Sequence, residues 1–120
     1  MNSDVKKLWI EALRSGNYEQ GKEVLETEDG KFCCLGVLSD LAVKHGITDR
    51  TVLYSESDMC DRVNYGDNYE VLNEDVMAWA GLTVSDPELS NGQNSTYASN
   101  WNDGKDATFN EIADMIERTL

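Results

Sequence analysis

The chain has 120 residues and a mass of 13.4 kDa, which predicts a single domain over residues 1–120. Its 23 acidic and 10 basic residues give a formal net charge of −13. This acidic excess argues against direct binding of nucleic acid or of an anionic membrane, because Lys and Arg bind phosphate groups. The sequence also lacks a long apolar run and a basic, apolar leader, so we expect neither a membrane span nor a signal peptide.

The cysteines indicate a compartment. The chain has three, at positions 33, 34 and 60, and an odd number without a secretion signal is typical of a reducing environment. Adjacent cysteines rarely bond to each other, because the resulting ring is strained. We therefore expect free thiols and a cytoplasmic protein.

The first half of the chain predicts two helices and a hairpin. Residues 4–15 carry an apolar stripe at helical spacing, with Ser3 as the expected cap and Gly16 as the stop. Residues 23–27 and 31–33 are expected to pair as a hairpin around Gly30. Residues 34–45 form the most apolar segment, which predicts a buried central helix that stops at Gly46.

The middle of the chain gives a weaker signal. Residues 51–54 and 69–72 have the composition of strands. The polar stretch between them, residues 55–68, has little to bury and is expected to form a short helix or a mobile loop.

The last third has clearer boundaries. A short helix is expected to begin after Asn73 and to end at Gly81. A turn at Asn91-Gly92 predicts two short strands around residues 89 and 97. Thr108 and Glu111 have the spacing of a capping box, which predicts a final helix. Together these signals predict an α+β fold with about four helices, a buried central helix and short antiparallel hairpins.

Several segments look familiar in this order. They are Trp9-Ile10-Glu11-Ala12-Leu13-Arg14-Ser15-Gly16-Asn17-Tyr18, Phe32-Cys33-Cys34-Leu35-Gly36-Val37-Leu38, Asn102-Asp103-Gly104 and Thr108-Phe109-Asn110-Glu111-Ile112-Ala113. The pattern resembles a family of small, uncharacterised proteins encoded in tailed-phage and prophage genomes. The resemblance implies a virus-encoded accessory protein of the host cytoplasm, and it carries over no catalytic residue.

Familiar catalytic and metal-binding patterns are incomplete. On one helix, Cys34 and the only histidine, His45, would be separated by about 16 Å, too far for a nucleophile and its base. Adjacent Cys33 and Cys34 do not have the spacing of paired zinc ligands. The acidic loop around Gly104 lacks the final glutamate of a calcium-binding loop. We therefore expect no cofactor, no metal ion and no catalytic residue, although an unrecognised carboxylate site of a hydrolase remains an alternative.

The distribution of charge along the chain is the sequence feature that indicates a function. Residues 51–104 contain ten acidic residues and one basic residue, Arg62, together with six tyrosine or tryptophan residues. Acidic side chains can steer association with a basic partner, and exposed aromatic rings can anchor it. The expected interaction surface consists of Glu56, Asp58, Asp61, Tyr65, Asp67 and Trp101. Trp9 and Trp79 lie on helical stripes and are expected in the core.

The leading functional hypothesis is a non-enzymatic phage accessory protein that binds a host protein with a basic surface. Such a protein could act in host takeover, as an anti-defence inhibitor or as a mimic of nucleic acid, if its carboxylates were spaced like phosphates. The alternative is a protein that binds or sequesters a nucleotide, for which Arg14, Arg50 or the helix N-termini would supply positive charge. The sequence leaves the oligomeric state open.

Overall fold

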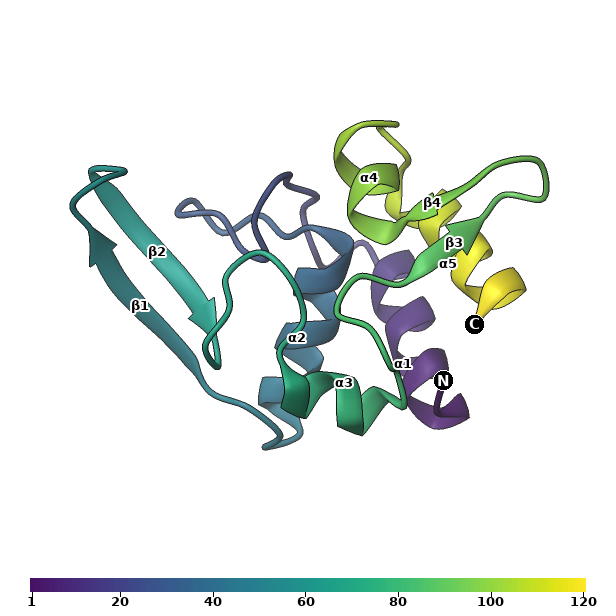
Figure 1. The fold of residues 1–120 in the computed structure, drawn as a ribbon, viewed down its shortest axis with the longest axis horizontal. Coiled ribbons are helices and arrows are strands. Elements are labelled where there is room, and N and C mark those ends of the chain that lie inside the picture. The colour runs from purple at the N-terminus through teal and green to yellow at the C-terminus, as the bar shows by residue number, and fades with distance from the viewer.

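Five helices and two antiparallel hairpins follow one another in the computed structural model, which describes all 120 residues (Figure 1). The elements are α1 (Ser3–Arg14), α2 (Cys34–Lys44), β1 (Arg50–Ser55), β2 (Cys60–Tyr65), α3 (Glu74–Ala80), β3 (Glu88–Ser90), β4 (Ser95–Tyr97), α4 (Ala98–Asp103) and α5 (Phe109–Thr119). The predicted α+β class is confirmed, whereas the number of helices is five rather than about four. None of these helices has the length and apolar character needed to cross a membrane.

Helix boundaries follow the sequence signals closely. Asn73 accepts a hydrogen bond from Val76 N–H at the start of α3, and the capping box of Thr108 and Glu111 is formed at the start of α5. Gly16, Gly46 and Gly81 follow α1, α2 and α3 with positive φ, as expected at helix ends.

The start of α1 differs by one residue from the prediction. Asn2, rather than Ser3, caps the helix, because its side chain accepts from the backbone N–H groups of Asp4 and Val5. Either residue type is a good N-cap, so only the backbone path distinguishes them.

The predicted central helix, α2, lies at the middle of one hydrophobic core of 25 buried residues. Helix α1 packs between α2 and α5, and its Trp9 is fully buried. The Trp9 indole N–H donates to the carbonyl of Cys34 over 2.9 Å, which ties α1 to the first turn of α2. The indole therefore fills the core while its polar atom keeps a partner.

The hairpin expected at residues 23–33 forms only in part, as a short antiparallel bridge around the turn and not as two strands. The turn at Gly30 is present, since Gly30 N–H donates to Thr27 O, but the flanking residues make only isolated bridges, from Gln20 and Glu26 to Phe32. Thr27 N–H donates to Lys31 O and Cys33 N–H donates to Leu25 O, so the two segments run side by side next to the turn. The pairing stops at Leu25, because its N–H donates to Tyr69 O instead.

The expected strand at residues 51–54 is present as β1 and pairs with β2, whereas the strand expected at residues 69–72 does not form. Strands β1 and β2 pair without interruption from Arg50 opposite Tyr65 to Ser55 opposite Cys60. The prediction of a helix or mobile loop over residues 55–68 is therefore wrong for β2. Val63 and Tyr65 are the only alternating apolar side chains in β2, which is too short a pattern to predict a strand.

The fifth helix, α4, gives no local signal. Its first turn has no side-chain cap, and its sequence is rich in residues that favour turns. The buried side chains of Ala98, Trp101 and Asn102 hold it in the core instead. The short strands around residues 89 and 97 are present as β3 and β4, as predicted.

Substituting Gly36 by alanine should destabilise the protein strongly. A Cβ at position 36 would lie 1.7 Å from the carbonyl oxygen of Leu25, so one of the two segments would have to move. We expect Gly36→Ala to lower the free energy of unfolding by about 3 kcal/mol, measured by urea denaturation. Gly46→Ala is the control, because position 46 has a positive φ and open space around it, and should cost only about 1 kcal/mol. Equal losses would show that Gly36 is not a packing constraint.

Candidate protein-binding site

The β1–β2 hairpin projects from one end of the molecule, along the longest of its 42 × 29 × 25 Å extents (Figure 1). Strand β2 packs against α2, and β1 lies on the outer side of β2. The two strands form a complete two-stranded sheet, so β1 has no second neighbour. One edge of this sheet is therefore free.

Large apolar side chains are concentrated on the hairpin. Six such side chains are exposed in the whole chain, and four of them lie within residues 52–59. These are Val52, Leu53, Tyr54 and Met59, with exposed fractions of 48%, 61%, 63% and 80%. Single exposed apolar residues are common on protein surfaces, but a cluster on one projecting element marks an interaction site.

An ion pair between buried Glu26 and exposed Arg50 fixes the base of the hairpin. Both carboxylate oxygens of Glu26 accept hydrogen bonds from the Arg50 guanidinium over 2.8 Å, and Oε1 also accepts from the Tyr65 hydroxyl over 2.5 Å. Glu26 is only 8% exposed and Tyr65 is fully buried. The bidentate geometry holds β1 and β2 against the segment that precedes α2.

This network sets the protonation states of its members. Burial favours the neutral form of Glu26, but the hydrogen bonds from Arg50 and Tyr65 outweigh it, and the pKa of Glu26 is lowered from its usual 4.5. Burial, together with the bond to Glu26, raises the pKa of the Tyr65 hydroxyl far above 10. At neutral pH the carboxylate is therefore charged and the phenol is a hydrogen-bond donor.

Acidic side chains surround the turn of the hairpin. Glu56, Asp58 and Asp61 are all exposed, as expected. Asp58 forms an ion pair with Arg62, whose guanidinium also lies over the Tyr69 ring, 4.0 Å from its centre. Glu56 and Asp61 are outside the ion pairs of the protein, so their charges are uncompensated.

A shallow pocket of about 270 Å³ lies beside β2, between Cys60–Val63 and residues 22–28. Glu23 and Glu28 line the opposite wall from Asp61, and neither forms an ion pair. Lys22 also lines the pocket, but its ammonium group pairs with Asp106. The neighbourhood of the hairpin therefore has an excess of negative charge.

The remaining residues of the expected surface lie elsewhere. Asp67 is exposed but follows the far end of β2, so it is separated from the turn by the length of the strand. Tyr65 and Trp101 were expected at the surface and are instead buried, which corrects the prediction. The prediction relied on the polar residues next to them in the sequence. In the structure, both rings are buried because their polar atoms have partners there: Glu26 for Tyr65 and the Leu89 carbonyl for Trp101.

The exposed apolar residues of β1 were missed by the prediction of the surface. The signal available in the sequence was the uncharged run Thr51–Ser55 beside a polar stretch with little to bury. Trp9 lies in the core as expected, and Trp79 is half-buried, with its ring 5.4 Å from that of His45.

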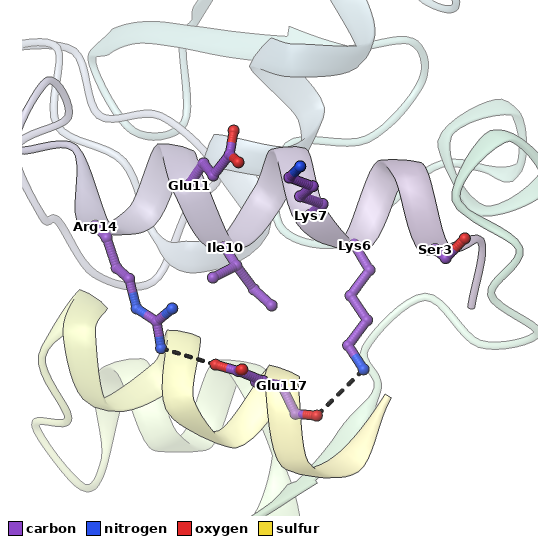
Figure 2. A pocket seen from close by; sticks show the side chains of 7 residues that line it. All are labelled: Ser3, Lys6, Lys7, Ile10, Glu11, Arg14 and Glu117. Atoms are coloured by element: carbon purple, nitrogen blue, oxygen red, sulfur yellow. Dashed lines mark hydrogen bonds and ion pairs between the residues drawn. The ribbon is translucent and has the colours of Figure 1, made fainter.

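The pocket between α1 and α5 has a volume of about 320 Å³ and contains the main group of cations (Figure 2). Arg14 is paired with Asp114 and Glu117, and Lys6 donates to the Glu117 carbonyl over 3.2 Å. Figure 2 shows that Glu11 also lines this pocket. An anionic ligand would therefore have to displace Asp114 and Glu117 to reach Arg14, whereas Lys6 and Lys7 form no ion pair with a carboxylate.

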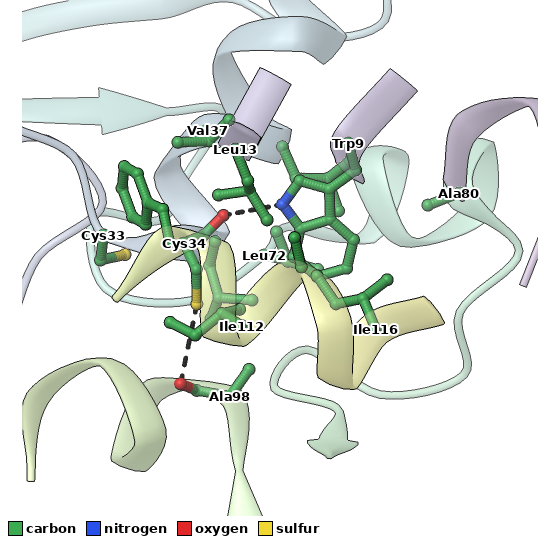
Figure 3. Close-up of a cluster of buried hydrophobic side chains, with 14 of the residues drawn as sticks. Trp9, Leu13, Cys33, Cys34, Val37, Leu72, Ala80, Ala98, Ile112 and Ile116 are labelled. Atoms are coloured by element: carbon green, nitrogen blue, oxygen red, sulfur yellow. Dashed lines mark hydrogen bonds between the residues drawn. The ribbon is translucent and has the colours of Figure 1, made fainter. Parts of the chain in front are cut away.

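Two of the three cysteines belong to the core (Figure 3). Cys33 caps α2, and burial raises the pKa of its thiol to about 12. Cys34 is fully buried, with its sulfur 3.6 Å from the Ala98 carbonyl, and burial raises its pKa well above 9. Both are poor nucleophiles, since the thiolate is the reactive form. No group of three or more His, Cys, Asp or Glu side chains is placed to hold a metal ion.

Glu26→Gln should destabilise the protein in a pH-dependent way. The substitution leaves Arg50 without its counter-ion, and we expect it to cost about 1–3 kcal/mol at pH 7. Because the folded protein lowers the pKa of Glu26, this contribution is present above about pH 4.5 and is lost as the pH falls through the lowered value. Urea denaturation between pH 7 and pH 3 should show the difference shrinking below pH 4.5. Glu28→Gln, at an exposed and unpaired position, should change little, and a pH-independent difference for Glu26→Gln would contradict the assignment.

Thiol labelling should distinguish the cysteines. In the native protein at pH 8, iodoacetamide should modify Cys60, which is partly exposed, and leave Cys33 and Cys34 unmodified. Unfolding in denaturant should expose all three. Peptide mass spectrometry gives the extent at each position, and fast native modification of Cys34 would show that the core around it opens.

Comparison with known proteins places the chain in a family but gives no activity. No curated protein and no solved structure is significantly similar to it. One family model, described as a domain of unknown function, matches residues 1–120 and so covers every element of the fold. The protein therefore belongs to the DUF8296 family.

Proposed function

We propose that this protein is a non-enzymatic accessory protein that binds another protein through the β1–β2 hairpin. The observation that carries the proposal is the concentration of exposed apolar side chains on that hairpin. Leu53 and Tyr54 lie on opposite faces of β1, since successive side chains of a strand alternate, so a partner could contact either face. Tyrosine is one of the residues that most often contribute strongly to binding, and neighbouring apolar side chains can exclude water around it.

The charges of the hairpin support a basic partner. Glu56 and Asp61 are uncompensated, and Glu23 and Glu28 add negative charge beside β2. In a chain with a net charge of −13, long-range attraction would favour encounters with a cationic surface. The proposal therefore combines charge for steering with apolar contacts for affinity.

The resemblance to phage and prophage proteins extends the proposal to a host protein as the target, bound in the host cytoplasm. A host-takeover or anti-defence role would follow from inhibiting that target. The carboxylates favour a local docking patch over a mimic of nucleic acid, because Asp58 is neutralised by Arg62 and Asp67 lies at the far end of β2. A nucleic-acid mimic would need a regular series of free charges.

The geometry gives less support to the other hypotheses. The two arginines expected to bind a nucleotide, Arg14 and Arg50, are both held by carboxylates, which leaves Lys6 and Lys7 as the cations without a carboxylate partner in the pocket between α1 and α5. A hydrolase would need convergent polar groups in a cleft, and every buried side-chain polar atom already has a partner within the protein.

Capture experiments with matched variants test the proposal. Tagged protein is incubated with bacterial lysate at low salt, and recovered proteins are quantified by mass spectrometry. We expect Leu53→Ser with Tyr54→Ser to reduce recovery of a specific partner at least about tenfold, which corresponds to ~1.4 kcal/mol. The control is Val84→Ser with Tyr97→Ser, which alters two other exposed apolar residues, both outside the β1–β2 hairpin.

Charge reversal gives a second, independent comparison. Glu56→Lys with Asp61→Lys should reduce recovery and weaken its dependence on salt, since both carboxylates are free. Asp67→Lys is the control, because it reverses an exposed charge away from the turn. If both hairpin pairs recover the same proteins as the wild type, the proposed function is wrong.

A further inference from the structure

The hydrogen-bond pattern of the hairpin identifies the free backbone groups of β1. Gly66 N–H donates to Asp49 O over 2.8 Å, just beyond the pair Arg50–Tyr65. In an antiparallel ladder, hydrogen-bonded and non-bonded pairs alternate, so Arg50, Val52 and Tyr54 belong to the non-bonded pairs. The direction of Tyr65 N–H agrees, because it donates to Asn68 O on the side away from β1.

The N–H and C=O groups of Arg50, Val52 and Tyr54 therefore point outward from the sheet. Those of Thr51, Leu53 and Ser55 point toward β2 and are already used. No third strand lies beside β1, and every residue from Arg50 to Tyr54 is exposed. The outer edge of β1 thus offers three residues whose donors and acceptors can pair with another extended chain.

This edge lacks the features by which proteins prevent strand addition. Such features are Pro, Lys, a bulge or a covering loop. Residues 51–55 contain no charge and no Pro, and the pairing with β2 has no bulge. The one charged residue of β1, Arg50, is held at the base of the hairpin by Glu26. The run Thr51–Tyr54 also has high intrinsic preference for strands.

The charges around the edge indicate the chemistry of an added strand. Asp61 lies directly opposite Tyr54, so it is one strand spacing from β1 and about 10 Å from a third strand. A Lys or Arg side chain on that strand could extend over the Tyr54 ring toward Asp61. Glu56, in the turn, adds a second free carboxylate near the same end.

We propose that the outer edge of β1 accepts an extended segment of a basic partner protein as a third antiparallel or parallel strand, with Lys or Arg placed near Tyr54. This inference rests on the proposed function and specifies how the partner is held. Main-chain hydrogen bonds to Val52 and Tyr54 supply affinity, and the side chains of the added strand supply selectivity. A second copy of this chain is a poorer occupant, because two molecules with a charge of −13 repel each other.

Amide hydrogen exchange measured by NMR tests the proposal directly. The probe is a synthetic ten-residue peptide in which valine and threonine alternate between two lysines at each end. At ten times its dissociation constant, it should slow exchange about tenfold at the amides of Val52 and Tyr54. The amides of Leu53 and Ser55, which already face β2, should change little, so the alternating pattern is the signature of strand addition.

Two further peptides define the outcome. A peptide with glutamates in place of the lysines should not bind, and one methylated at alternate backbone nitrogens should lose the effect. If the lysine peptide at about 1 mM slows no amide, the proposal is overturned. A dissociation constant above that concentration would mean a binding free energy weaker than about −4 kcal/mol. If the amides of Val52 and Tyr54 exchange slowly in the protein alone, and light scattering shows dimers, the strand added to β1 comes from a second copy of this chain. That result would overturn the proposal of a basic partner.

Variants separate this proposal from the proposed function. Val52→Pro removes an outward N–H and no bond of the hairpin, whereas Val52→Thr keeps the N–H and changes only the side chain. We expect Val52→Pro, and not Val52→Thr, to lose the peptide and the captured partner. Amide spectra report whether the hairpin of the Val52→Pro variant is intact. If it is not, the peptide methylated at alternate backbone nitrogens provides the test of main-chain hydrogen bonding in the wild-type protein.

Partner capture that survives Val52→Pro, but not Leu53→Ser with Tyr54→Ser, would overturn strand addition and leave the proposed function standing. Capture that survives every hairpin variant would overturn both.

Discussion

The path of Leu25 and Glu26 is the constraint on which the arrangement of this protein depends. The Leu25 carbonyl accepts from Cys33 N–H and lies so close to α2 that only glycine fits at position 36. The Leu25 N–H donates to Tyr69 O, beyond the hairpin. One short segment therefore joins the start of the central helix to the chain on the other side of β2.

Glu26 extends this connection to the hairpin itself. Its carboxylate is taken out of water, which is costly unless its charge and lone pairs are satisfied. Arg50 from β1 and Tyr65 from β2 do so together, so the base of both strands is fixed by one side chain. The rest of β1 then extends past the core, and its apolar residues have no surface of their own protein to cover them. The same anchoring that orders the hairpin thus leaves one of its edges available to another molecule.

The accuracy of the sequence-based prediction varied with the range of the interactions involved. The caps at Asn73 and Thr108 and the glycine at position 81 could be predicted, because each acts on backbone groups within a few residues. Strand β2 and helix α4 could not, because pairing with β1 and burial against the core stabilise them. The surface prediction failed for the same reason at Tyr65 and Trp101, whose polar neighbours in the sequence are not their neighbours in space.

By itself, the sequence determined the α+β class, the buried central helix, the acidic balance and the limits of the capped helices, since composition, periodicity and capping are local properties. The tertiary structure decided which carboxylates are free, which aromatic rings are buried and which strand edge is open. The position of the hairpin and the burial of Tyr65 depend on Glu26 meeting Arg50 and Tyr65, 24 and 39 residues further along the chain. Contacts over such separations follow from the packing of the whole chain, and no local pattern encodes them.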